Sequence, residues 1–116
     1  MGRPPEPPVI PFLVFLMAGP LIWAVHFAVL YGGHTLLCAA ALDMWAKPLV
    51  AAATILAGLA ILALLHRPDV WARRLGLGAV GPYRTDLARL LAALSGLAVL
   101  WGGATALVLT ACVGGR

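Results

Sequence analysis

Residues 20 to 38 read PLIWAVHFAVLYGGHTLLC, and this stretch decides the fold. It contains no Asp, Glu, Lys or Arg, and the apolar run extends back to Ile10. Roughly 20 apolar residues in a helix cross a hydrocarbon core of about 30 Å, so the stretch predicts a transmembrane span. It also carries two histidines, a tyrosine, a tryptophan and a cysteine, the side chains in this chain most able to support chemistry.

The composition of the whole chain also indicates a membrane protein. Of its 116 residues, 63% are hydrophobic and only 10% are charged, and the mean hydropathy is +1.01. A chain of this kind has too little polar surface to cover a water-soluble globule. We therefore expect an all-α, single-domain bundle of three transmembrane helices, with a short interfacial segment between the second and the third. The predicted parts are a proline-rich cytoplasmic tail at 1–9, span 1 at 10–38, span 2 at 48–66, a cytoplasmic interfacial loop at 67–84 and span 3 at 85–112.

The basic residues predict the orientation of the chain. Lys and Arg near the ends of spans prefer the cytoplasmic side of a membrane. With the amino terminus inside, only Lys47 and Arg116 lie outside, whereas Arg3, Arg67, Arg73, Arg74, Arg84 and Arg89 are cytoplasmic. We expect a multi-pass protein of the bacterial inner membrane with its amino terminus inside and its carboxyl terminus outside. Because the basic residues flank apolar spans, they do not suggest a nucleic-acid partner.

Span 1 is longer than a bilayer core is thick, so it must tilt, kink or project. Pro20 lacks a backbone donor and crowds the preceding turn, which predicts a kink between Leu16 and Pro20. The run Ala39-Ala40-Ala41 resembles a signal-peptide cleavage motif. The apolar run before it is far longer than a normal signal-peptide core, so we expect no cleavage.

The segment after span 2 predicts contact with the membrane surface. Residues 66 to 75 read HRPDVWARRL and form a short amphipathic pattern. Arg67, Arg73 and Arg74 are expected to face lipid phosphates, and Trp71 the boundary of the acyl chains. These membrane lipids are the first predicted partners of the chain.

Other residues predict how the helices begin and meet. Pro48 suits the first position of span 2, and Thr85 is expected to cap span 3 with Asp86 in its first turn. Pairs of small residues four apart allow helices to approach closely. These pairs are Thr54 with Gly58 in span 2 and Ala92 with Gly96 in span 3, and Gly102-Gly103 beside Trp101 predicts that span 1 approaches span 3.

The two cysteines, Cys38 and Cys112, fall at the outer ends of spans 1 and 3. On the oxidising side of an inner membrane, a disulfide is the expected state. Two buried free thiols are one alternative. A metal site formed by both cysteines and His34 is another, since His34 lies one helical turn from Cys38.

His26 lies near the middle of span 1, where an unpaired ionisable group is costly. It is expected to be a neutral imidazole bonded to a backbone carbonyl, to Thr54 or to Thr105. Contact with haem or quinone in a larger assembly, and a proton relay, are the alternatives. His34 is rotated about 80° from His26 around the helix, and His66 lies at the opposite membrane face, so the histidines of one chain cannot form a three-ligand site.

Catalytic patterns are missing from the sequence. There is no Cys-x-x-Cys-His haem attachment, no paired-carboxylate site and no nucleophile triad, and acidic residues number only four. We therefore expect that the isolated chain is not an enzyme.

The pattern Trp23-x-x-His26-Phe27-x-x-x-Tyr31, followed by Cys38 and a last span that ends in Cys112, resembles that of small three-span proteins of proteobacterial inner membranes. Such proteins are found with cytochrome c oxidase and its assembly factors. The resemblance implies that Trp23, His26 and Tyr31 form a face for a partner or cofactor. It also implies that Cys38 and Cys112 form an external staple.

The resemblance implies a non-catalytic accessory subunit or assembly partner of a respiratory haem-copper oxidase-type complex. The cofactor is left open, since haem or copper is possible but not required. One alternative is a small haem- or copper-binding membrane protein that uses His26 or His34 and the outer cysteines. A small transporter or channel subunit is a second alternative, which the lack of charge within the spans disfavours.

Overall fold

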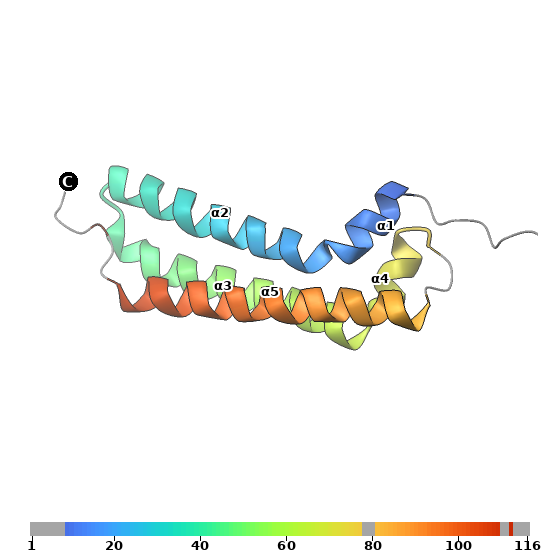
Figure 1. Cartoon of the computed structure of the whole chain (residues 1–116). Coiled ribbons are helices and arrows are strands. Elements are labelled where there is room, and N and C mark those ends of the chain that lie inside the picture. Colours follow the sequence, from blue (N-terminus) through green and yellow to red (C-terminus); the bar gives the residue numbers. More distant parts are fainter. Residues whose placement is uncertain (1–8, 78–80, 110–111, 113–116) are drawn as a thin grey trace, which may run out of the picture.

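Three long helices lie side by side in the computed structural model, which describes residues 9–77, 81–109 and 112 (Figure 1). In these residues every regular element is a helix, as the all-α prediction requires. Three helical segments are long and apolar enough to cross a membrane: Ala18–Ala39, Asp43–His66 and Pro82–Val108. The elements are α1 (Val9–Leu16), α2 (Ala18–Ala39), the short 3-10 helix η1 (Asp43–Trp45), α3 (Ala46–His66), α4 (Pro68–Arg74) and α5 (Pro82–Val108).

The predicted kink is present, and it divides span 1 into two helices. Met17 separates α1 from α2. Pro20 has no N–H to donate to the carbonyl of Leu16, and its ring crowds that carbonyl, so the helix cannot continue unbroken through this turn. Hydrogen bonds resume on both sides, where the Met17 N–H donates to Leu13 at 2.8 Å and the Leu21 N–H to Met17 at 2.8 Å. The predicted span over 10–38 thus consists of two helices that meet at the predicted kink, and of these two only α2 is long enough to cross a membrane.

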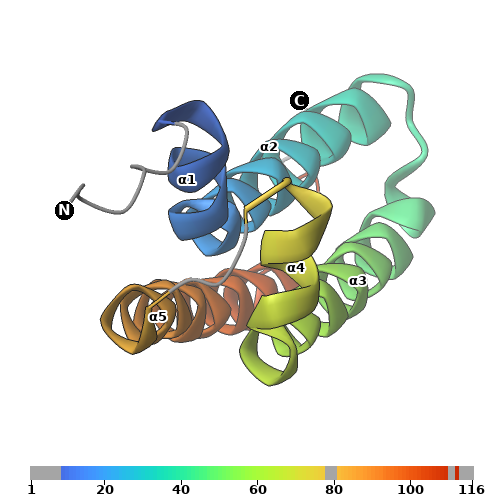
Figure 2. The ribbon, with the colours of Figure 1, turned by 90° about the vertical axis from the view of Figure 1, so that its right-hand side faces the viewer.

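The short helix α4 crosses the end of the bundle beside α1 (Figure 2). It begins with Pro68 at its first position, has Asp69 in its first turn and ends with Arg73 and Arg74, so its charges complement the helix dipole. A cluster of buried side chains joins this end of the molecule. It consists of Phe15, Ala72 and Leu77, with Phe12, Trp71, Leu75 and Ala88 packed against them.

The surroundings of Trp71 are partly protein. Its side chain is half-buried and packs against this cluster, so the expected place of the indole at the acyl boundary stays a prediction. Its apolar ring is more favourably covered by protein than left at a surface, as for any large aromatic side chain. The arginines Arg67, Arg73 and Arg74 are exposed, as an outward-facing role requires.

Two helix starts differ from the predictions. Helix α3 begins at Ala46, so Pro48 is its third residue, where the N–H would also have had no helical partner. Helix α5 begins at Pro82 after Gly81. Thr85 therefore lies within the first turn, and its hydroxyl donates to the carbonyl of Gly81 at 3.1 Å instead of capping the helix.

Glycines allow the closest helix contacts. A Cβ placed on Gly19 of α2 would lie 2.6 Å from the Cα of Ala92 on α5. A Cβ on Gly103 of α5 would lie 2.5 Å from the Thr54 hydroxyl of α3. Both distances are shorter than carbon contacts permit, so only glycine fits at these points.

The predicted small-residue pairs have different outcomes. Ala92 is buried, and a Cβ on Gly96 would meet Ile61 at 3.3 Å, so this pair lies at a helix contact. Nothing lies within 4 Å of a Cβ placed on Gly58, so Gly58 takes part in no close approach, whereas Thr54 of the same pair lies at the contact with Gly103. The core between the three long helices consists of Ala57, Ile61, Ala92 and Val99.

Candidate functional site

His26 lies inside the bundle and makes a hydrogen bond across it. Its side chain is only 4% exposed, and its Nε2 lies 3.0 Å from the Thr54 hydroxyl of α3. Gly103 on α5 leaves the space that Thr54 occupies, and a Cβ placed on Gly102 would lie 3.9 Å from the His26 Cε1. The predicted bond to Thr54 is thus present, and it gives the Nε2 of the imidazole a partner within the chain.

Thr105, the other proposed partner of His26, does not reach it. Its hydroxyl donates instead to the carbonyl of Trp101 at 2.8 Å. A Cβ would fit at Gly102 beside His26 of α2, so the predicted close approach of span 1 at Gly102-Gly103 is not seen there, whereas Gly103 permits the close contact with Thr54 of α3. Trp101 itself is exposed and packs in neither contact.

Trp23 and Tyr31 do not share the face of His26. Trp23 is 41% exposed and Tyr31 is 71% exposed, and both project outward from α2. Phe27 lies between them at four-residue spacing, with ring centroids 6.1 Å from Trp23 and 6.3 Å from Tyr31. We call these three residues the aromatic ridge. Five residues of helix place Tyr31 about 140° from His26, and this rotation was the signal that the proposed common face overlooked.

Cys38 and Cys112 form the predicted disulfide, with their Cα atoms 5.3 Å apart. The alternative of two free thiols is wrong, since neither cysteine is free. His34 lies against this disulfide, and its Nε2 accepts a hydrogen bond from the backbone N–H of Cys112 at 3.5 Å. The imidazole nitrogen and the two sulfur atoms lie within 4.8 Å of one another. We call His34, Cys38 and Cys112 the outer clasp.

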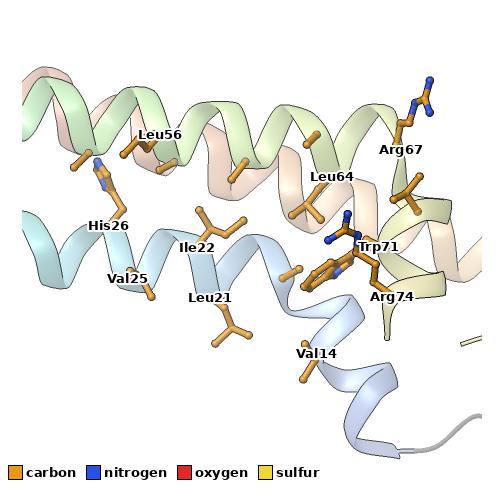
Figure 3. Close-up of a pocket in the computed structure, with 16 residues that line it drawn as sticks. Val14, Leu21, Ile22, Val25, His26, Leu56, Leu64, Arg67, Trp71 and Arg74 are labelled. Carbon is orange, nitrogen blue, oxygen red and sulfur yellow. The ribbon is translucent and has the colours of Figure 1, made fainter. Parts of the chain in front are cut away.

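The structure also reveals a groove that the sequence did not predict. It runs between α2 and α3, encloses about 950 Å³ and is lined almost entirely by apolar side chains (Figure 3). His26 marks one end, and Arg67, Trp71 and Arg74 mark the other (Figure 3). The side chain of Arg74 extends toward the groove, whereas that of Arg67 points away from it (Figure 3).

Within the described ranges, the charged end of this groove has an unpartnered indole N–H and two arginines without an ion pair. The Trp71 Nε1 is buried and has no hydrogen-bond partner within the part of the chain that the structure describes. Arg73 is exposed and pairs with Asp69 at 3.5 Å, and it does not line the groove. Among the described residues, no ion pair involves Arg67 or Arg74.

The comparisons give no relative from which a role can be carried over. No family model matches the chain, and neither the curated proteins nor the solved structures include a match. Function must therefore be inferred from the three features above: the aromatic ridge, the outer clasp and the groove.

Proposed function

We propose that this chain is a non-catalytic accessory subunit or assembly partner of a respiratory haem-copper oxidase-type complex in the bacterial inner membrane. The observation that carries the proposal is the aromatic ridge, which faces away from the bundle. Aromatic side chains supply large and rigid contact surfaces, and Trp and Tyr are enriched where proteins meet. In this proposal the haem is bound by helices of the partner, and the aromatic ridge is the surface that contacts them.

The interior of the bundle supports a structural role. His26 is bonded to Thr54, and the Ser95 hydroxyl donates to the carbonyl of Leu91 at 2.8 Å. Both polar groups are therefore satisfied within the chain. The acidic residues of the described ranges, Asp43, Asp69 and Asp86, lie at or near helix starts and away from His26. No carboxylate of the described residues therefore lies beside His26, and this favours a structural role over acid–base chemistry.

Mild-detergent purification tests the proposal. The ridge variant Trp23→Ala/Phe27→Ala/Tyr31→Ala is compared with Leu90→Ala/Leu94→Ala/Leu97→Ala, which removes exposed side chains from α5. We expect oxidase subunits and a haem spectrum to co-purify with the natural chain and the α5 variant, and to fall at least tenfold with the ridge variant. Purification of the natural chain without any oxidase subunit would contradict the proposal.

A copper-binding role is a second candidate, and the outer clasp favours it. A dithiol reductant would transfer two electrons and two protons to the disulfide and yield the thiols of Cys38 and Cys112. Cu(I) would then displace the thiol protons and bind two thiolates and His34, the soft ligand set that Cu(I) prefers. The imidazole of His26 is less suited to a metal, because among the described residues it belongs to no group of three such ligands.

Metal content separates these two candidates. The reduced protein, incubated with Cu(I) under anaerobic conditions and desalted, should retain one copper per chain if the clasp is a metal site. Cys38→Ser should abolish retention, and His26→Ala should leave it unchanged. The absence of copper from the reduced natural chain would exclude this role. The transport alternative gains no support, since charged side chains in the described spans lie near the helix ends.

A further inference from the structure

We propose that the groove between α2 and α3 binds one anionic phospholipid, with its acyl chain along the groove and its phosphate at Arg74. This inference does not depend on the oxidase partner. A volume of about 950 Å³ lies at the upper end of the range of roughly 300–1,000 Å³ that is usual for ligand pockets. The groove is therefore large enough to hold a substantial part of a lipid molecule.

The groove is longer than one leaflet of a bilayer is deep. Its lining residues on α3 run from Ala53 to Arg67 at the end of the helix, which corresponds to about 21 Å of helix. Half of a hydrocarbon core is about 15 Å thick. An acyl chain that entered beside Arg67 would thus remain in the groove over the full depth of its leaflet. Alanines at 53, 57, 60 and 63 of α3 leave the space that the chain would fill.

The charges of the groove select an anionic head. Arg67 and Arg74 line it, and no acidic side chain does. Asp69, the nearest acid in sequence, pairs with Arg73 outside the groove. The guanidinium of Arg74 extends toward the groove, and a phosphate there could accept paired N–H bonds (Figure 3).

Trp71 supplies an unfilled donor beside this charge. Its Nε1 is buried and unpartnered among the described residues, and a buried N–H without an acceptor is costly. In this proposal a rotation of the indole exposes Nε1 to the ester carbonyl of the phospholipid, which lies just below the phosphate. At the opposite end, the Nε2 of His26 already bonds Thr54, and no charged side chain of the described residues lines the groove there. The groove is thus charged at Arg74 and apolar along the rest of its length. This distribution favours a phospholipid with its head at Arg74, and it disfavours a quinone, whose head would lie deep in the membrane.

Native mass spectrometry of the full chain in mild detergent tests the proposal. The protein is titrated with phosphatidylglycerol and phosphatidylcholine that carry the same acyl chains. We expect one phosphatidylglycerol per chain, bound in preference to phosphatidylcholine. Arg74→Gln should weaken phosphatidylglycerol binding about fivefold, since a basic residue near a lipid surface contributes about that factor. Arg73→Gln removes the same charge from the same helix outside the groove and should have no effect.

A second pair of variants tests the path of the acyl chain. Ala60→Phe would fill the groove, whereas Ala52→Phe places the same ring on an exposed position of α3 outside it. We expect binding of both lipids to be lost only with Ala60→Phe. Equal effects of Arg73→Gln and Arg74→Gln would indicate general surface attraction and overturn the proposal. Displacement of the phospholipid by a short-chain ubiquinone, with Arg74→Gln still binding that quinone normally, would overturn it in favour of a quinone site.

Discussion

At the scale of single residues, the most consequential contact is the bond between His26 and Thr54. It joins α2 to α3 at a point where α5 presents glycine to both side chains. A histidine in the membrane interior costs free energy unless it has a hydrogen-bond partner, and Thr54 offsets this cost. The pair thus explains a polar residue in an apolar bundle without any reference to catalysis.

Thr54→Val should destabilise the bundle, because valine keeps the shape of threonine but leaves the imidazole unpaired. Hydrogen bonds between membrane helices contribute about 0.6 kcal/mol on average, and a buried unpaired group costs about 1–3 kcal/mol. We expect a loss of about 1 kcal/mol in the free energy of unfolding, measured by reversible unfolding in mixed micelles. Thr54→Ser should retain the stability of the natural chain. Equal stability of Thr54→Val and the natural chain would show that the bond contributes nothing.

At the scale of elements, α1 is held by packing and not by continuity with α2. The break at Met17 separates the two helices, and Phe15 then fits between α4 and the segment that follows it. The same cluster gives Trp71 its inward position. The kink at Pro20 therefore shapes the end of the bundle at which the groove opens.

Phe15→Ala should detach α1 from this cluster. Phe15 is buried, whereas Leu13 on the same helix is exposed and serves as a control. Truncation of a buried Phe in a soluble protein costs about 3–5 kcal/mol. We expect about 2 kcal/mol here, because part of the site faces lipid, whose tails replace some of the lost contacts. Limited proteolysis near residue 9 should accelerate in Phe15→Ala and not in Leu13→Ala. Identical digestion of the two variants would contradict this role for Phe15.

At the scale of the whole molecule, the fold followed from the sequence more closely than the site did. The bundle was predictable because three apolar runs can cross a membrane only as helices. The kink was predictable from the proline near one helix start. The bond to Thr54 was predictable because a buried histidine needs a partner. The outward position of Tyr31 was harder to predict, because lipid-facing and core-facing positions are both apolar in a membrane helix. Trp71 suits an interface and a core equally well, and the groove depends on how two helices diverge, which no single segment encodes.

The disulfide connects this fold to the predicted orientation. It joins residues 74 apart in sequence, and on the chain-entropy model closure of such a loop contributes roughly 4 kcal/mol. Disulfides form on the oxidising side of an inner membrane and are rare in the cytoplasm. The outer clasp should therefore face the exterior, as the distribution of basic residues also predicts.

Labelling of intact cells with a membrane-impermeant maleimide tests both parts of this inference. The natural chain should react only after treatment with a dithiol, because both thiols are bonded. Cys38→Ser frees Cys112, which should react from outside without a reductant. Arg73→Cys, which keeps the disulfide and adds a thiol at the opposite end of the bundle, should react only with a permeant maleimide. Reaction of Arg73→Cys from outside, with Cys112 protected, would reverse the orientation. It would also place the disulfide in the reducing compartment, where it would not persist.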